Sequence, residues 1–147
     1  MKKCIILVTV CLFYCHTGVA NSQQSLVMSF AKFKQVTGTL HYQVLDCSDT
    51  SLEWDELPSV VTDELAITDQ LHEQIVELNS GTYCVRFFQD LNSNEKLDLA
   101  ASSIPKEPVG FSNNPNLMFG QPSPSDSAFS LTTDLHLNIK VNNKKRR

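Results

Sequence analysis

Five residues in one short polar segment have the types and the spacing of a calcium-binding loop. Counted from Asp90, oxygen-bearing groups stand at positions 1, 3, 5, 7 and 9: the side chains of Asp90, Asn92, Asn94 and Asp98, and at position 7 the backbone carbonyl of Lys96. Calcium takes six to eight oxygen ligands, and this spacing matches the first part of an EF-hand loop. Calcium is therefore a candidate cofactor, held by a loop that follows a strand ending at Asp90.

The calcium pattern is incomplete, and the same residues have a simpler interpretation. Position 12 is Ala101 where the pattern has a bidentate Glu, and position 6 is Glu95 where it has a Gly. A left-handed backbone at Glu95 would cost roughly 1–2 kcal/mol. Asp and Asn side chains also hydrogen-bond to the backbone of ordinary turns. We favour the turn and keep weak, millimolar calcium binding as the second hypothesis.

Residues 1–20 have the three parts of a secretory signal peptide. Two lysines stand near the start, the stretch Cys4–Cys15 is uncharged and almost entirely apolar, and the small residues Gly18 and Ala20 come before the expected cleavage site. The apolar stretch is shorter than the roughly 20 residues that span a membrane. We therefore predict cleavage after Ala20, a periplasmic or secreted protein, and a single domain over residues 21–147.

The chain that remains after cleavage is acidic. It carries 10 basic and 16 acidic side chains, which give a net charge of −6. A nucleic-acid-binding surface would be broadly basic, so we expect no nucleic-acid partner. We also expect no transmembrane segment after cleavage. Four basic residues form the tail Lys144–Arg147, within the short basic end 142–147, and we interpret them as a solvated end rather than a contact patch.

Cys47 and Cys84 are the two cysteines that remain after cleavage, in a compartment where disulfides persist. Both lie in predicted strands, on the parity opposite to the predicted core residues. Side chains on one face of neighbouring strands can meet, so we favour a bridge over a pair of free thiols. On the chain-entropy account, the bridge would contribute about 4 kcal/mol to stability.

Hydrophobic alternation predicts a protein built mainly of β-strands. The clearest strand is Thr82–Asp90, in which Tyr83, Val85 and Phe87 share one face. Further strands are predicted over residues 26–33, 36–47, 72–78 and 128–141. A helix is an alternative around Thr62–Gln74. We expect an all-β fold, an antiparallel β-sandwich of about seven strands, with the shared face of Thr82–Asp90 pointing inward.

A long polar stretch, Leu91–Ser127, interrupts the strand pattern and contains five of the six prolines. Loops of this length inside a compact domain are usually functional or disordered. Disordered segments lack apolar anchors, whereas this stretch contains Ile104, Val109, Phe111, Leu117, Met118 and Phe119. We therefore predict an ordered loop excursion packed against the sandwich. Residues 48–58 are also polar and turn-rich, with Trp54 as their one large anchor.

Several uncommon strings stand in a fixed order between residues 79 and 130. They are Gly81-Thr82-Tyr83, the loop Asp90–Asp98, the segment Ile104–Asn114 and the closing Phe119–Ser123. Together they resemble the bacterial exported family called domain of unknown function 2141. Its members typically show G-T-Y, D-x-N-x-N-G-K-L-D, I-P-x-E-P-x-G-F-S-N-N and F-G-x-P.

Two positions depart from that family pattern. Gln89 stands where the family often has His, and Glu95 stands where it usually has Gly. The two cysteines of the expected bridge are not part of the pattern. The resemblance implies a prealbumin-like or immunoglobulin-like sandwich, and it implies no established activity.

Phe111, Asn113, Asn114 and Phe119 are candidates for a recognition surface. Asn amides both donate and accept hydrogen bonds, and aromatic rings offer the flat apolar faces that sugar and peptide sites use. The alternative is internal, with the Asn pair capping loop backbone and the Phe residues holding the loop to the core. We favour the internal role.

The chain carries no complete catalytic signature that we recognise. Ser112 lacks the Gly that a nucleophile elbow needs two residues later, and His41, His72 and His136 are isolated in sequence. We therefore expect a non-enzymatic binding or structural module of the cell envelope, with an envelope protein or glycan as partner. The alternative is an envelope hydrolase or metal-dependent enzyme with its site in the region 90–120.

Overall fold

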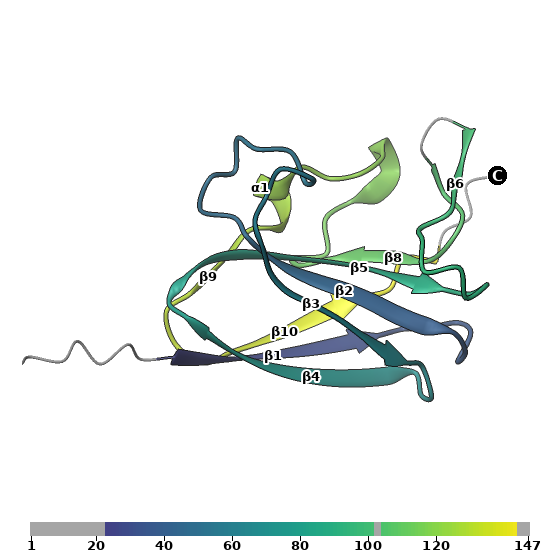
Figure 1. Ribbon diagram of the computed structural model, residues 1–147, viewed down its shortest axis with the longest axis horizontal. Helices are drawn as coiled ribbons and strands as arrows, with labels where there is room; N and C mark the ends of the chain where they lie inside the picture. Colours follow the sequence, from purple (N-terminus) through teal and green to yellow (C-terminus); the bar gives the residue numbers. More distant parts are fainter. Residues whose placement is uncertain (1–22, 102–103, 144–147) are drawn as a thin grey trace, which may run out of the picture.

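Two main β-sheets pack face to face in the computed structural model, which describes residues 23–101 and 104–143 (Figure 1). In chain order the elements are β1 (Gln23–Ala31), β2 (Thr39–Asp46), β3 (Ser59–Ala66), β4 (Leu71–Asn79), β5 (Gly81–Asp90), β6 (Leu99–Ala100), β7 (Ile104–Pro105), β8 (Val109–Phe111), the 3-10 helix η2 (Leu117–Phe119), α1 (Pro124–Ser127), β9 (Phe129–Leu131) and β10 (Leu135–Lys140). The expected signal peptide and the tail Lys144–Arg147 lie outside the described residues.

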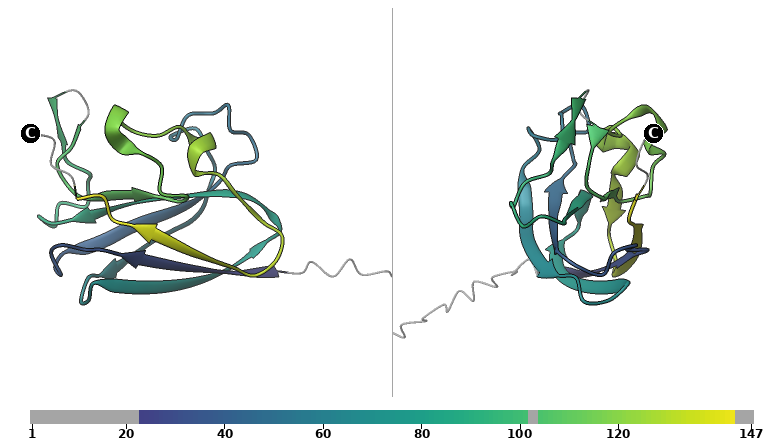
Figure 2. Two further views of the ribbon diagram at one scale, coloured as in Figure 1. Left: turned by 180° about the vertical axis from the view of Figure 1, so that it is seen from behind. Right: turned by 90° about the vertical axis from the view of Figure 1, so that its right-hand side faces the viewer.

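One sheet has three strands in the order β10-β1-β4, and the other has five, in the order β3-β2-β5-β8 with β9 also paired to β5. Strands β6 and β7 form a separate two-stranded hairpin. Figure 2 shows the two larger sheets as stacked layers, with the hairpin and both short helices outside them. The prediction of an all-β sandwich is confirmed.

The strand count and one predicted element need correction. The described residues form ten strands rather than about seven, because the loop excursion adds β6, β7 and β8 and because the single strand expected over 128–141 is divided into β9 and β10. The helix considered around Thr62–Gln74 is wrong, since this stretch consists of the end of β3, the connection 67–70 and the start of β4. Pairing of β4 with β1 along its whole length overrides the helix propensity of its Glu and Leu residues. Among the described residues, no helix is long and apolar enough to cross a membrane.

One strand pair departs from the antiparallel expectation. β10 runs parallel to β1, in a register that starts with Leu26 opposite Leu135 and ends with Ala31 opposite Lys140. Hydrophobic alternation reveals which face of a strand is buried but not the direction of its neighbour, so the sequence pattern could not reveal this. As a consequence, the chain leaves both strands at the same end of the sandwich.

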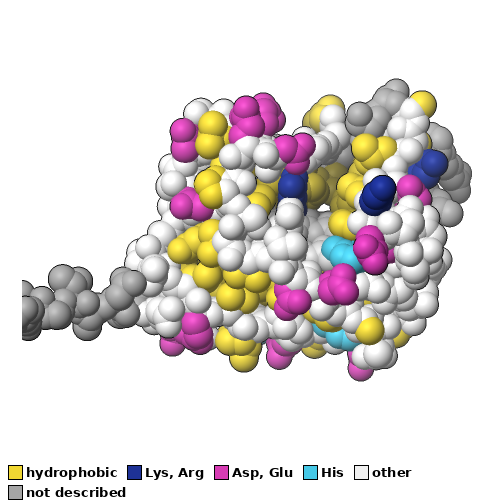
Figure 3. All heavy atoms as spheres, viewed as in Figure 1, with side chains coloured by type: hydrophobic (Ala, Val, Ile, Leu, Met, Phe, Trp, Pro, Cys, Tyr) yellow, Lys and Arg dark blue, Asp and Glu magenta, His cyan; other side chains and the backbone are white. Residues whose placement is uncertain are grey.

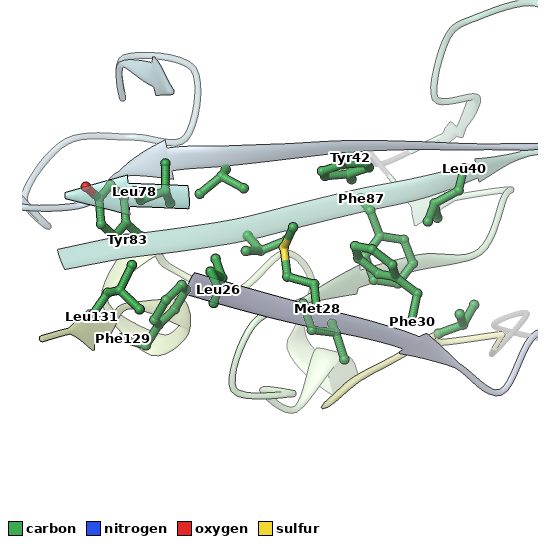
Figure 4. Packing of buried hydrophobic residues seen from close by; sticks show 14 of the residues in the cluster. Leu26, Met28, Phe30, Leu40, Tyr42, Leu78, Tyr83, Phe87, Phe129 and Leu131 are labelled. Atoms are coloured by element: carbon green, nitrogen blue, oxygen red, sulfur yellow. The ribbon is translucent and has the colours of Figure 1, made fainter. Parts of the chain in front are cut away.

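The main core lies between the two larger sheets. Phe30 of β1 meets Phe87 of β5 edge to face, with ring centroids 5.1 Å apart, and meets Tyr42 of β2 at 5.4 Å (Figure 4). Tyr83, Val85 and Phe87 are all buried and point inward, as predicted. Gly110 of β8 permits this packing, because a Cβ atom there would lie 2.2 Å from Cζ of Phe87.

A second hydrophobic cluster covers part of the opposite face of the five-stranded sheet. Its buried members are Leu45, Cys47, Trp54, Leu57, Cys84, Val109 and Phe111. Trp54 anchors the loop 48–58 here, and its indole Nε1 donates a buried hydrogen bond of 2.7 Å to the carbonyl of Pro122. Cys47 and Cys84 form a disulfide within this cluster, with Cα atoms 5.7 Å apart, so the predicted bridge is present.

Removing the bridge should lower stability without changing the fold. The linked residues are 37 apart in sequence, and the chain-entropy account then gives about 4 kcal/mol. We expect Cys47→Ala/Cys84→Ala to lose a few kcal/mol in urea unfolding and wild-type protein under reductant to lose a similar amount. Intact mass after alkylation reports the thiols, and two labelled thiols in unreduced, exported protein would contradict the bridge.

Candidate functional site

A groove of about 1050 Å³ lies on the outer face of the five-stranded sheet. The segments around it stand over this sheet, on the side away from the three-stranded sheet (Figures 1 and 2). They are the loop 48–58, the segments 91–101 and 104–107 that include β6 and β7, and the segment 112–127 that includes η2 and α1. The space-filling view shows a hollow between raised parts of this face, bordered by hydrophobic, acidic and basic side chains (Figure 3).

Two rows of side chains that cross the strands form the floor of the groove. The first row runs across β3, β2 and β5 through Glu64, His41 and Phe88. The second row runs across the same strands through Thr62, Gln43 and Arg86. Residues directly opposite each other on antiparallel strands share a face and touch. The sheet register itself therefore sets the spacing of the polar groups in the floor.

Arg86 joins the floor to the loop 48–58. Its Nε donates a hydrogen bond of 2.8 Å to Oε1 of Gln43, and its Nη1 lies 3.1 Å from Oδ1 of Asp55. The guanidinium carbon is 5.7 Å from the ring centroid of Trp54, within reach of a cation–π contact. Because Asp55 is 91% exposed, its ion pair with Arg86 adds little stability. It does place one positive charge among the groove's carboxylates.

His41 occupies the centre of the first row, between two carboxylates. Its ring stacks on Phe88 with centroids 4.9 Å apart and an interplanar angle of 14°. Nδ1 lies 3.3 Å from Oε2 of Glu64, and Nε2 lies 3.7 Å from Oδ2 of Asp90. Nε2 is buried and has no hydrogen-bond partner among the described residues. The imidazole is thus held in position by packing and charge rather than by a close hydrogen bond at Nε2.

Apolar side chains form two facing walls above this floor. Leu97, Leu99, Ile104 and Pro105 line one side, and Leu117, Met118 and Phe119 line the other. Phe119 is 91% exposed and Met118 is 59% exposed. Exposed apolar groups that gather around one concavity, with polar residues at the rim, are typical of interaction sites.

Asp90 organises the loop that borders the groove. Its carboxyl group is buried, and Oδ1 accepts hydrogen bonds from the backbone N–H groups of Asn92 and Ser93, at 3.1 and 2.7 Å. Oδ2 accepts from the N–H of Glu95 at 2.8 Å. Ser93 and Glu95 both have φ of 60°, so Glu95 adopts the left-handed conformation considered for it. These bonds are those of the turn interpretation.

The hydrogen bonds in this turn lower the pKa of Asp90. Burial of the carboxyl group raises its pKa, but the backbone N–H groups of Glu95, Ser93, Asn92 and Asn94 together outweigh burial. Hydrogen bonds to the charged form favour that form, so the pKa lies below its ordinary value. Asp90 therefore acts as a buried anion that holds the loop.

The other predicted calcium ligands bond to one another. Nδ2 of Asn92 and Nδ2 of Asn94 donate to the two carboxylate oxygens of Asp98, at 2.7 and 3.3 Å. Oδ1 of Asn94 accepts from the N–H of Lys96 at 2.9 Å. An ion on Asp98 would have to replace the two amide donors. No group of three or more His, Cys, Asp or Glu suited to a metal occurs in residues 23–101 and 104–143, and calcium binding stays a prediction.

Glu107 fastens the loop to the wall of the groove. Its Oε1 accepts from the N–H of Leu91 at 2.9 Å, and its Oε2 accepts from the N–H of Asp98 at 3.1 Å. The carbonyl of Asp98 in turn accepts from the N–H of Lys106 at 2.8 Å. Both ends of the loop are therefore tied to one buried carboxylate.

The four residues of the predicted recognition surface divide into two kinds. Phe111 is buried against Trp54, and the amides of Asn113 and Asn114 donate hydrogen bonds of 2.8 Å to the carbonyls of Ala128 and Asn138. Both Asn residues have positive φ, which Asn tolerates better than most residues. Phe119 projects into solvent at the groove. Three of the four residues therefore make internal contacts, and the fourth, Phe119, is exposed.

A family model matches residues 28–139, which is more than half of the chain, and its description is "Uncharacterized protein conserved in bacteria (DUF2141)". The chain belongs to the DUF2141 family. The searches of curated proteins and of solved structures each found no match.

Of the four strings that carry the resemblance to the DUF2141 family, three contribute lining residues to the groove and Gly81-Thr82-Tyr83 does not. Gly81-Thr82-Tyr83 begins β5, the loop Asp90–Asp98 borders the groove, and the segment Ile104–Asn114 contains β7 and β8. At the departure from the family pattern, Gln89 is buried, and its Nε2 donates hydrogen bonds of 2.8 Å to the carbonyls of Gln35 and Thr37.

Sequence reasoning missed four residues of this site: His41, Arg86, Phe88 and Glu107. A signal for two of them existed. The parity argument that placed Cys84 on the outer face of β5 also places Arg86 and Phe88 there, because they follow it by two and four residues. Nothing in the sequence pattern showed that His41 would lie between Glu64 and Asp90, since that depends on the pairing of three strands.

Asp90 should make the protein sensitive to acid. Its folded pKa is lowered, so its contribution to stability is complete above the unfolded value of about 3.9 and is lost as the pH falls through the folded value. We expect Asp90→Asn to lose roughly 1–3 kcal/mol at pH 7 in urea unfolding. The difference in unfolding free energy between wild type and Asp90→Asn should narrow below about pH 4. Asp98→Asn should lower the unfolding free energy less at pH 7, because the Asp98 carboxylate accepts hydrogen bonds, among the described residues, only from the side-chain amides of Asn92 and Asn94. If the difference in unfolding free energy between wild type and Asp90→Asn stays constant with pH, the ionised Asp90 carboxylate does not stabilise the fold in this way.

The calcium hypothesis makes a separate prediction about thermal stability. An ion that binds only the folded state raises the melting temperature by mass action. Calcium at millimolar concentration should then raise the melting temperature of wild type relative to chelator, and should not raise that of Asp98→Asn. A wild-type melt that is indifferent to several millimolar calcium would leave the loop as a self-contained turn.

Proposed function

We propose that this protein is an exported, non-enzymatic binding module that holds an extended segment of an envelope protein in the groove. The observation that carries the proposal is the groove itself, a sheet floor with polar rows between two facing apolar walls. Its volume of about 1050 Å³ is at the upper end of the range for small-ligand sites, which suits a longer ligand.

The chemistry of the groove favours a peptide that is apolar and basic. Three exposed carboxylates line the rim or floor and have few basic neighbours: Asp55, Glu64 and Glu95. A further lining carboxylate, Glu107, is buried and accepts backbone hydrogen bonds. Arg86 is the one Lys or Arg among the described lining residues, and Asp55 pairs with it. An extended peptide alternates its side chains, so apolar residues would contact the walls while basic residues meet the carboxylates. A polyanion such as nucleic acid would be repelled.

A glycan fits the same surface less well. Sugar sites use open aromatic faces together with free donors and acceptors. One face of Phe88 is covered by His41, and Trp54 is buried, so exposed aromatic surface at the groove comes mainly from Phe119. A peptide is therefore the favoured partner.

The arrangement of the groove supports binding over catalysis. His41 is a candidate general base, and a hydrolase would need a nucleophile or an activated water beside it. The hydroxyl of Thr62 shares a hydrogen bond of 2.8 Å with the hydroxyl of Ser59. Both oxygens of Asp90 and both of Glu107 accept backbone hydrogen bonds, which supports a structural role for these acids.

The exported location rests on residues 1–20 and gains support from the bridge. Disulfides persist in oxidising compartments outside the cytoplasm. The intact mass that reports the thiols of Cys47 and Cys84 also identifies the first residue. A chain that begins at Asn21 would agree with export, and a chain that retains Met1 would contradict cleavage.

The binding experiment uses a short fluorescent peptide of alternating leucine and lysine, titrated with the mature protein and followed by anisotropy. Met118→Ser/Phe119→Ser removes one apolar wall and should weaken binding roughly tenfold or more. Leu71→Ser/Ile75→Ser is the matched control, because these β4 residues are 51% and 66% exposed and do not line the groove. The control should bind as wild type does.

Three outcomes would overturn the peptide proposal. One is equal binding of a peptide in which glutamate replaces lysine. Another is equal weakening by the control variant. The third is binding of an N-acetylglucosamine oligomer in place of either peptide, which would make the partner a glycan.

A further inference from the structure

A second concavity, of about 510 Å³, has the opposite charge from the groove. Three of the six Lys and Arg residues that the structure describes line it: Lys32, Lys34 and Lys140. None of its described lining residues is a carboxylate. We call this concavity the lysine pocket. In a chain that is acidic overall, half of the described basic residues gather at one small site.

The fold brings these lysines together through the parallel pairing of β1 with β10. Ala31, the last residue of β1, is paired with Lys140, the last residue of β10. Lys32 is the next residue after Ala31 and is therefore near Lys140. Lys34 follows Lys32 by two residues in the sequence. The N–H of Lys140 donates a hydrogen bond of 2.7 Å to Oδ1 of Asn114, another residue of the pocket, which fixes the backbone there.

Lys32 keeps its place in a backbone conformation that lysine rarely adopts. Its φ is 73°, in the left-handed region that favours glycine. Its carbonyl accepts a hydrogen bond of 3.0 Å from Nδ2 of Asn143, which also lines the pocket. Residues held in strained backbone conformations cluster at functional sites. Lys32 is such a residue, and it carries a long cationic side chain at the edge of a concavity.

The positive charge of the pocket is not neutralised within the described part of the chain. In residues 23–101 and 104–143, no carboxylate lies within 4.0 Å of the ammonium groups of Lys32, Lys34 or Lys140. Arg86, by contrast, pairs with Asp55. In the sequence, four more basic residues follow Asn143 directly. An anion that enters the pocket would lie beside three lysine residues, and none of the described lining residues is an acid.

We propose that the lysine pocket binds a phosphate group attached to a small organic body. Lysine offers a compact point charge suited to phosphate, whereas planar carboxylates are matched best by the fork of arginine, and none of the described lining residues is an arginine. Phe111, Leu117 and Val141 also line the pocket and give it apolar surface for the carbons next to the phosphate. The pocket adjoins the peptide groove, and the phosphate proposal does not rest on the peptide proposal.

The phosphate has two chemical sources, a phospholipid headgroup and a free phosphate ester. The experiment therefore measures binding of the mature protein to phosphatidylglycerol vesicles, to phosphatidylcholine vesicles and to soluble glycerol phosphate. Lys32→Gln/Lys140→Gln is the pocket variant. Lys96→Gln/Lys106→Gln is the control with the same change in charge, because neither of its lysines lines the pocket. A thermal melt verifies that both variants fold.

We expect the pocket variant to bind its phosphate source about tenfold or more weakly, from the contribution of each lysine near an anionic surface, and the control to bind as wild type does. If the pocket variant loses binding to glycerol phosphate, a phosphate ester is sufficient as the ligand. If it loses binding only to phosphatidylglycerol vesicles, the lipid surface is the source. Added salt should weaken both interactions. The proposal is overturned if wild type binds neither phosphatidylglycerol vesicles nor glycerol phosphate. It is also overturned if the pocket variant and the control variant bind equally. Binding that a chain truncated after Asn143 loses, and the pocket variant keeps, overturns it too.

Discussion

Burial of β5 on both of its faces is the constraint on which the rest of the structure depends. Tyr83, Val85 and Phe87 point into the main core, while Cys84, Arg86 and Phe88 point the other way. An antiparallel sheet can leave one face to water, but this outward face carries a disulfide and aromatic surface. The chain therefore has to cover it with segments that are not part of the sandwich.

The covering segments are held by a few specific contacts rather than by a second sheet. Trp54 anchors the loop 48–58 through its hydrogen bond to Pro122, and Phe111 packs against the same indole. On the other side, Asp90 and Glu107 hold the loop 90–98 through backbone N–H groups. Buried carboxylates are tolerated only when they are hydrogen-bonded, and these two are. The groove is the part of the outer face that the two covers leave open, so its width depends on both sets of contacts.

The sequence predicted the parts that depend on local pattern. Alternation in Thr82–Asp90 identified both faces of β5, and the parity of Cys47 and Cys84 was enough to expect their bridge. Parallel pairing of β10 with β1, and the extra strands of the excursion, depend on long-range contacts that a single strand's period does not encode. The same limit applies to the site. The loop 90–98 was visible as a motif, whereas His41 and Lys140 acquire neighbours only when strands distant in sequence are paired.

The groove and the lysine pocket adjoin and separate charge of opposite sign within one small protein. Phe111, Leu117 and Asn142 line both concavities, so two apolar residues and one amide stand between an acidic groove and a basic pocket. The charges that favour a basic peptide on one side repel a phosphate, and the lysines that favour a phosphate on the other side repel a basic peptide. On the two proposals, each concavity would therefore reject the ligand that suits its neighbour. On these proposals, an anionic surface that attracts Lys32, Lys34 and Lys140 would be repelled by Glu64 and Glu95 of the groove, so it would not compete with the peptide there.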